Sequence, residues 1–208
     1  LGYPTNLLLG FDYEKSDEDI RNKLSYPEWF FFTDDRYELN REYYGYFAHA
    51  EVSLSDKLEV SGGARKSKGD FDFKYKTGGT SESKTMDEDQ YTFGLNYRLL
   101  NNSSVYASYT RSTRFPVLDE FFSYTDNSIN SALKEQTTDG FEGGLRLRHE
   151  SGAVFSGNLF RFETEDEIFY NPYNEDNIFG ANDNLDGDTV RQGVELAISH
   201  EFDDFLLT

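Results

Sequence analysis

The sequence predicts an all-β fold, an antiparallel meander of about eight long strands from a transmembrane β-barrel. Three observations predict it. Apolar and polar residues alternate with period two along most of the 208-residue chain, which is the strand signature. The strands are about 10–14 residues long, close to the length that crosses a bilayer. Short and long connections also alternate strictly, which is typical of a barrel with short periplasmic turns and long extracellular loops.

The alternation defines each strand in turn. In the second strand Tyr46, Ala48 and Ala50 share one face, and in the fourth strand Phe93 and Leu95 do the same. The predicted strands, in chain order, are 6–15, 41–54, 57–68, 90–100, 103–114, 139–150, 152–162 and 189–202.

Two kinds of connection join these strands. Three are tight hairpin turns rich in Ser, Asp, Asn and Gly, over 55–56, 101–102 and 150–152. The other four are predicted as long loops, over 16–40, 69–89, 115–138 and 163–188. Structureless loops longer than about 12–15 residues are uncommon in compact domains, so four of them at one end indicate a function there.

The net charge of −19 is unevenly distributed. The four long segments, with the third counted to residue 139, hold 27 acidic and 7 basic side chains, a net charge of −20. The strands and turns hold 12 acidic and 13 basic side chains, a net charge of +1. The acidity therefore belongs to one end of the barrel. It either keeps the loops solvated or attracts divalent cations or a cationic ligand.

Composition excludes several classes of protein. An isoelectric point near 4.4 argues against a nucleic-acid partner. The absence of Cys excludes disulfides, a thiolate nucleophile and a Cys zinc site. A mean hydropathy of −0.72 excludes a bundle of transmembrane helices. The three histidines, His49, His149 and His200, share no spacing. We therefore predict no catalytic site, no cofactor and no metal centre.

Several segments, in order along the chain, resemble the barrel of TonB-dependent outer-membrane receptors. The clearest is 105–122, which is similar to a strand of the pattern "YaSys.gfR.P.l.el". Residues 133–146 resemble "LkPE.s..yElGlr", although Gln136 follows Glu135 where the family usually shows Pro-Glu. Further matches, to a strand containing Ile168, to "N.g....GvEle" and to an earlier hairpin, cover 158–168, 184–195 and 46–65.

The resemblance implies that residues 1–208 are a single partial barrel domain, an internal section of a barrel of about 22 strands. The plug domain and the remaining strands would lie outside this chain. The resemblance also implies an outer-membrane location, contact with membrane lipid and lipopolysaccharide, and coupling to the TonB complex through the plug. The expected function is import of a bulky nutrient, most commonly a ferric siderophore. Residues 200–208 end as another strand begins, which fits a piece of a longer protein.

Aromatic clusters in the long segments are candidate ligand contacts. Their rings would stack on a catecholate or a sugar, pack loop against loop, or join the aromatic girdle at the lipid boundary. The clusters are Tyr26, Trp29, Phe30, Phe31 and Phe32; Phe121, Phe122 and Tyr124; and Tyr170, Tyr173 and Phe179.

Charged residues within the strands are expected to face the lumen and to pair with the plug, if the apolar face meets lipid. They are Glu51, Arg65, Arg98, Arg111, Glu142, Arg146 and Glu195. Separately, 182–188 resembles half of a calcium loop with Gly187 at the sharp turn, but it lacks the first Asp and last Glu of an EF-hand. Its candidate cation ligands are Asp183, Asp186 and Asp188, and a plain polar loop is the alternative.

Two other functions stay open from the sequence. The chain could be a complete eight-stranded barrel with a structural or adhesive role, which would require 6–15 to pair with 189–202. It could also be a soluble β-rich binding module.

Overall fold

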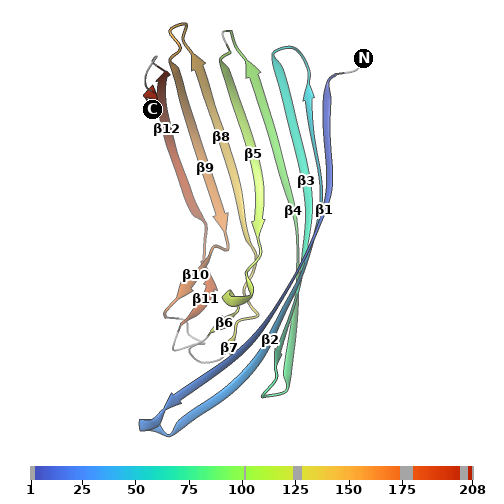
Figure 1. Ribbon diagram of the computed structural model, residues 1–208, viewed down its shortest axis with the longest axis vertical. Helices are drawn as coiled ribbons and strands as arrows, with labels where there is room; N and C mark the ends of the chain where they lie inside the picture. Colours follow the sequence, from blue (N-terminus) through green and yellow to red (C-terminus); the bar gives the residue numbers. More distant parts are fainter. Residues whose placement is uncertain (1–2, 101, 124–127, 174–179, 202–205, 208) are drawn as a thin grey trace.

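The computed structural model describes residues 3–100, 102–123, 128–173, 180–201 and 206–207. The main sheet is an antiparallel meander in the order β1-β2-β3-β4-β5-β8-β9-β12-β13, and Figure 1 shows it curved into a trough. This confirms the predicted fold. Its long strands are β1 (Thr5–Tyr26), β2 (Phe31–Ser53), β3 (Leu58–Tyr75), β4 (Thr80–Arg98), β5 (Ser104–Arg114), β8 (Gln136–Arg148), β9 (Val154–Glu165) and β12 (Thr189–Glu201).

The sheet is open among the described residues. β1 pairs only with β2, and β12 pairs with β9 and with the two-residue strand β13 (Leu206–Leu207). Among the described residues, 6–15 and 189–201 do not pair, as a complete small barrel would require. No helix among the described residues is long and apolar enough to cross a membrane.

The tight turns lie together at one end of the sheet, at the top of Figure 1. The amide of Leu54 donates to the carbonyl of Leu58 at 2.8 Å, and the amide of His149 donates to the carbonyl of Ala153 at 2.8 Å. Asn102 (φ 56°) and Gly152 (φ 89°) adopt the left-handed backbone that such turns need. The predicted short connections are confirmed, although Asn101 lies outside the described residues.

The prediction of long loops over 16–40 and 69–89 is wrong. β1 continues to Tyr26 and β2 starts at Phe31, so only the 3-10 helix η1 (Pro27–Trp29) and Phe30 connect them. Likewise, β3 ends at Tyr75 and β4 starts at Thr80. The face of these outer halves that continues the apolar stripe carries charged residues instead, such as Asp19, Arg21 and Lys23 on β1. Their register is supported instead by cross-strand ion pairs, such as Arg21–Asp34 at 2.5 Å.

The other two long segments do leave the main sheet, and each forms a small hairpin. The first contains the 3-10 helix η2 (Leu118–Glu120), β6 (Phe122–Ser123) and β7 (Ser128–Ile129). The second contains β10 (Ile168–Asn171) and β11 (Ala181–Asn184).

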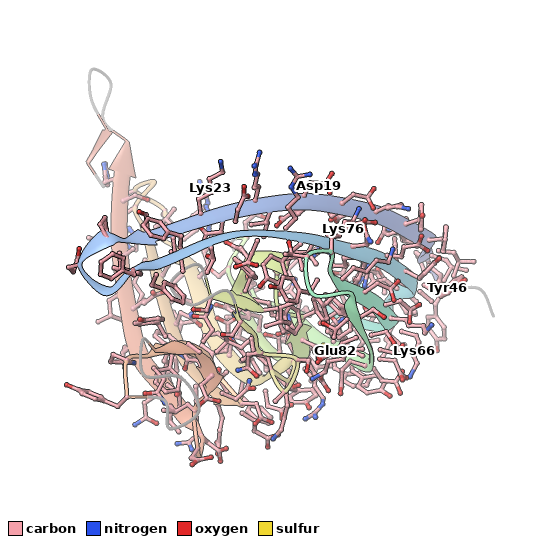
Figure 2. The ribbon with its side chains drawn as sticks, turned by 90° about the horizontal axis from the view of Figure 1, so that it is seen from below. Asp19, Lys23, Tyr46, Lys66, Lys76 and Glu82 are labelled. Carbon is pink, nitrogen blue, oxygen red and sulfur yellow. The ribbon has the colours of Figure 1, made fainter. Side chains whose placement is uncertain are left out.

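The two faces of the sheet differ in chemistry. Leu95 lies opposite Val60 and Ala107, and it is 54% exposed on an apolar face. Its neighbour Asn96 lies opposite Glu59 and Tyr106 on a polar face. Figure 2 views the sheet from the hairpin end, the end that carries the β1–β2 and β3–β4 hairpins. It shows Asp19 and Lys23 pointing away from the trough, and these residues share the parity of the apolar residues of β1. The apolar face is therefore convex and the polar face concave.

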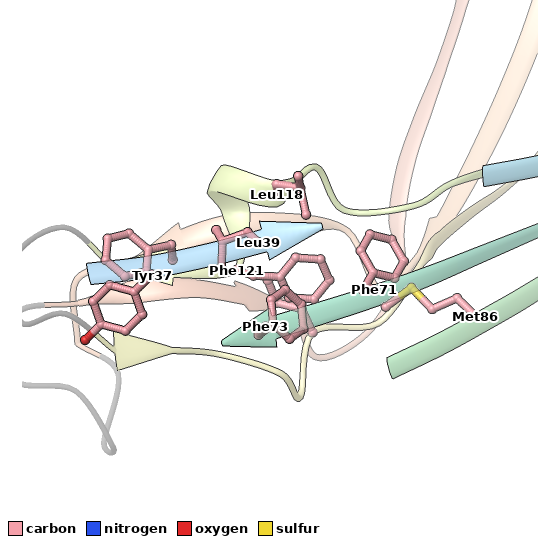
Figure 3. Packing of buried hydrophobic residues seen from close by; sticks show 9 residues of the cluster. Tyr37, Leu39, Phe71, Phe73, Met86, Leu118 and Phe121 are labelled. Atoms are coloured by element: carbon pink, nitrogen blue, oxygen red, sulfur yellow. The ribbon is translucent and has the colours of Figure 1, made fainter. Parts of the chain in front are cut away.

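A hydrophobic core lies on the concave side at the hairpin end, where the η2–β6–β7 segment folds onto the wall formed by β2, β3 and β4 (Figure 3). The ring of Phe121 lies 5.1 Å from Phe71 and 4.9 Å from Phe73, centroid to centroid. Such a core fixes the segment as a layer on the wall rather than a solvated loop. Its buried members are Tyr37, Leu39, Phe71, Phe73, Met86, Leu118, Phe121, Phe122 and Leu133.

Candidate functional site

The aromatic residues predicted at the mouth fall into covered and exposed groups. Phe121 and Phe122 are 1% and 4% exposed, and Phe122 packs edge-on against Tyr37 at 4.8 Å. Their rings are used in packing loop against wall, so in this arrangement they do not offer free faces for a ligand. Tyr124 and Phe179 lie outside the described residues.

The tip of the β1–β2 hairpin carries the exposed group. Phe30 is 90% exposed and has a left-handed backbone (φ 50°), which turns the chain after η1. Phe31 is 47% exposed and lies 6.0 Å from Tyr26, ring to ring, and Phe32 is 65% exposed. Trp29 belongs to η1 at the same tip. An apolar tip in water is available for a binding partner or a ligand.

A pocket of about 250 Å³ lies between the η2–β6–β7 segment and the β10–β11 hairpin. It brings Phe121 and Phe122, which the sequence placed in one cluster, together with Tyr170, which it placed in another. Tyr170 is 58% exposed, and Tyr173, just beyond β10, is 89% exposed. No residue of the β1–β2 tip lines this pocket. The other lining residues are Asp119, Glu120, Ser123, Ser128, Asn130, Gly180, Ala181 and Asn182.

Asparagine side chains hold the two sides of this pocket together. Nδ2 of Asn130 donates to the carbonyl of Asn182 at 2.7 Å, and Nδ2 of Asn182 donates to the carbonyl of Glu120 at 3.0 Å. Nδ2 of Asn184 donates to the carbonyl of Asp166 at 2.7 Å. These bonds satisfy loop backbone without regular secondary structure. Sequence reasoning missed them because an amide's partners lie far away in the chain.

Lys84 fixes the same segment to β4. Its ammonium group donates to the carbonyls of Ser131, at 2.8 Å, and Leu133. Burial lowers the pKa of Lys84. Close by, burial raises the pKa of Glu88, and the carboxylate of Glu135 raises it further. The pocket is thus carried on a firmly attached loop.

The candidate cation ligands do not form a metal centre. Among the described residues, no three His, Cys, Asp or Glu side chains come close enough together to hold a metal ion. Asp183 accepts from the amide of Asn184 at 2.9 Å, so it shapes the loop. Gly187 has φ 95° and makes the predicted sharp turn. Asp186 and Asp188 lie in the connection between β11 and β12.

Six of the seven charges predicted to face the lumen have the parity of the concave face, and four of them, Arg98, Glu142, Arg146 and Glu195, are without an ion-pair partner among the described residues. Arg98 and Arg146 both lie opposite Ser104, so they share one row across the sheet. Glu142 lies opposite Ser108, and Glu195 lies opposite Asn158. Within the part of the chain that the structure describes, none of these four charges takes part in an ion pair. They are therefore available to a group inside the trough.

The sequence matches the family model described as "TonB dependent receptor-like, beta-barrel" over residues 1–208. The chain belongs to the TonB-dependent receptor family. Its section of barrel accordingly lies in the bacterial outer membrane, with the convex face toward lipid and the concave face toward the lumen.

Solved structures of such receptors share this fold. The copper transporter OprC aligns with a TM-score of 0.75 at 16% identity, covering 95% of this chain and 32% of that one. The ferric yersiniabactin uptake receptor FyuA from Yersinia pestis gives 0.69 at 14% identity, covering 97% and 31%. The siderophore receptor PiuA from Acinetobacter baumannii gives 0.69 at 15% identity, covering 96% and 33%. The chain thus spans about a third of these receptors. No curated protein matches it.

One predicted lumen residue of this TonB-dependent receptor section faces the other way. Arg111 lies opposite Tyr91 and Asp139, on the face that carries Tyr109. Its Nη1 donates to Oδ2 of Asp139 at 2.7 Å. The prediction of a lumen-facing Arg111 is wrong, because its period-two parity is that of the lipid-facing residues.

Arg65 does face the lumen of the receptor section but already has partners. Its guanidinium lies 2.7 Å from a carboxylate oxygen of Asp12 and donates to the hydroxyl of Tyr43 at 2.9 Å. It also lies against Gly45, where an added Cβ would approach Nη2 to 2.1 Å. The glycine therefore makes room for the guanidinium. Arg65 is built into the wall rather than left for the plug.

Carboxylates on the outer halves of the receptor's hairpins are expected to stay ionised in acid. Hydrogen bonds from the Lys76 ammonium first, and from Asn40 and Lys74, lower the pKa of Glu38 to about 2. Because the pKa of Glu38 is lowered in the folded hairpin, its pairing stabilises the hairpin at pH values above the ordinary carboxyl pKa. This stabilisation is lost as the pH falls toward about 2. Carboxyl carbon shifts of labelled Glu38 should therefore titrate near pH 2. In a K74A/K76A variant the titration should return toward the ordinary range; an unchanged midpoint would contradict the assignment.

Proposed function

We propose that this chain is a barrel section of an energy-coupled outer-membrane transporter that imports a bulky nutrient, and that the nutrient is a ferric siderophore. The observation that carries the proposal is the pocket at the mouth, which opens beside exposed Tyr170 above a lumen-facing wall. In this proposal the loops capture the ligand, the plug is displaced by pull from the TonB complex, and the ligand passes along the lumen. The chain itself catalyses nothing.

The choice of cargo rests on the mouth and on the relatives. Exposed rings at the tip and at the pocket suit flat catecholate or other aromatic groups, which stack offset or edge-on. PiuA is named as a siderophore receptor and FyuA as a ferric yersiniabactin uptake receptor, although OprC is named as a copper transporter. Of the aromatic residues predicted from the sequence, we propose five as ligand contacts: Trp29, Phe30, Phe31, Tyr170 and Tyr173. Phe121 and Phe122 would act by holding the pocket in place.

We also propose that Arg98, Glu142, Arg146 and Glu195 pair with charged groups of a plug. Unpaired charges in a confined lumen are costly unless a partner neutralises them. Opposite charges on adjacent rows of the wall suit a plug surface that carries both signs. A plug bound in this way would be the route by which the TonB complex acts on the barrel.

Tyr170 provides a test of the ligand site in the full-length receptor. The variant Y170A should bind a ferric siderophore about two- to tenfold more weakly, the worth of one aromatic contact. Y46A is the matched control, because Tyr46 is 60% exposed but lies on the lipid-facing side. Titration of the purified receptor would measure both. Equal affinities in the two variants would remove Tyr170 from the site.

Loss of the gene provides the wider test. Under iron limitation, a strain without the gene should grow more slowly than its parent when the siderophore is the only iron source. Equal growth of the two strains would count against the siderophore as cargo while leaving the transporter class intact.

A further inference from the structure

The pocket between the η2–β6–β7 segment and the β10–β11 hairpin has no basic side chain among its described lining residues. Two of these residues, Asp119 and Glu120, are acidic, and the others are uncharged. Residues 115–133 and 165–190, which supply the whole lining, hold 3 and 8 acidic side chains, respectively, and no Lys, Arg or His. An anionic ligand would therefore meet no basic partner in the two segments that form the pocket.

The basic side chains that border these two segments already have acceptors. The ion pairs are Arg114–Glu120 at 2.9 Å, Lys134–Asp166 at 3.1 Å and Arg191–Glu167 at 2.5 Å. Lys84 donates to two backbone carbonyls of the first segment. Asp119 is exposed, and it forms no ion pair within the described part of the chain. The bordering cations therefore leave the charge of Asp119 to a ligand.

The amide and ring groups of the pocket do not replace the missing cations. Asn130 and Asn182 each use Nδ2 to donate to a backbone carbonyl, at 2.7 and 3.0 Å. The hydroxyl of Tyr170 lies so close to Gly180 that an added Cβ there would approach it to 2.5 Å, so the glycine makes room for the tyrosine. The face of such a ring attracts a cation and not an anion. The carboxylate and the ring therefore favour the same sign of ligand charge.

We propose that this pocket selects ferric siderophores whose iron complex is neutral or positively charged, and that it excludes polyanionic complexes. This selection, which rests on the siderophore cargo proposed above, narrows that cargo by charge. Three hydroxamates neutralise a ferric ion, so a ferric trihydroxamate that carries a protonated amine is a cation. Three doubly ionised catecholates leave the complex strongly negative. A mouth of one sign of charge concentrates the cation and repels the anion, and Asp119 then receives the amine.

The test uses the purified full-length receptor and three iron complexes. They are the cationic ferric complex of desferrioxamine B, its neutral N-acetylated form, and ferric enterobactin, which is an anionic tris-catecholate. The cationic complex should bind about two- to fivefold more tightly than the acetylated form, the worth of one exposed ion pair. It should bind at least about tenfold more tightly than the tris-catecholate, which meets like charge. Added salt should reduce both ratios, because it screens exposed charges.

Variants of Asp119 assign the preference to the pocket. Asp119→Asn should remove the difference between the cationic and acetylated complexes while the acetylated form still binds, which shows that the pocket is intact. Asp119→Lys should weaken the cationic complex further and strengthen the tris-catecholate. Asp19→Lys is the matched control, because Asp19 is also exposed at the hairpin end but points away from the trough (Figure 2). Its ratios should equal those of the parent.

The outcomes separate the charge selection from the cargo. Tighter binding of the tris-catecholate by the parent, or unchanged ratios in Asp119→Lys, would overturn the charge selection while leaving a siderophore as the cargo. A change in Asp19→Lys as large as that in Asp119→Lys would also overturn it, because the field of the whole mouth and not the pocket would then select. Failure of the parent receptor to bind any of the three complexes would overturn the siderophore cargo itself, and the selection with it.

Discussion

Replacing Phe73 by alanine is expected to cost about 3–5 kcal/mol of local stability and to release the η2–β6–β7 segment from the hairpin wall. Phe73 is 1% exposed and lies 4.9 Å from Phe121, ring to ring, inside the core at the mouth. Its removal leaves a cavity that the segment is too tightly packed to fill. Amide hydrogen exchange of residues 115–123 in the reconstituted full-length receptor would measure the loss as faster exchange.

Phe30 supplies the control for this prediction. It is the same residue type on a neighbouring hairpin, but it is 90% exposed. Its alanine variant should change local stability by no more than about 0.5 kcal/mol. If exchange in the segment were unchanged in F73A, the segment would be held by its asparagine and lysine hydrogen bonds rather than by the core.

Arginine at Leu95 is expected to destabilise the barrel by about 2–4 kcal/mol, the cost of a charge on the lipid face near the bilayer midplane. Leu95 lies midway between Tyr91, on the apolar face of β4, and Leu99, which follows that strand, and it is 54% exposed. The measurement is the denaturant midpoint of the full-length receptor in lipid vesicles. The magnitude should fall in short-chain lipids, where the midplane is nearer water.

Asn96→Arg is the matched control, one residue along the same strand. Asn96 lies opposite Glu59 and Tyr106 on the polar face, so an arginine there meets an aqueous lumen and a carboxylate. Its effect on the midpoint should be small. A larger effect for N96R than for L95R would mean that the two faces of the sheet are assigned the wrong way round.

The sequence could predict the membrane-spanning half of each strand because lipid imposes a strict rule there. One face of every strand must be apolar, so period-two alternation such as Phe93, Leu95 and Tyr97 is visible without any structure. The same rule would have predicted Arg111 correctly, because its parity is that of Tyr109. Outside the membrane neither face of a strand has to be apolar. Asp17, Glu18 and Asp19 alternate faces without alternating chemistry, so the sequence predicts a loop where the structure has a strand.

The candidate site was only partly predictable for a related reason. Aromatic clusters at the mouth could be found, but whether a ring binds a ligand or packs in a core depends on partners far away in the chain. Phe121 is buried against Phe71 and Phe73, which lie about fifty residues earlier in a segment predicted as a loop. Tyr170 and Phe30, by contrast, are 58% and 90% exposed.

The apolar side chains of this sheet lie in two different environments, a core that excludes water at the mouth and lipid along the convex wall. Phe71, Phe73 and Phe121 bury their rings away from water, so their association carries the heat-capacity change of the hydrophobic effect. The lipid-facing side chains of the same sheet gain nothing of that kind, because acyl chains already surround them. Cooling and urea both weaken burial from water. They should therefore loosen the mouth while the wall keeps its shape, which makes the capturing end of the molecule the part most responsive to temperature and medium.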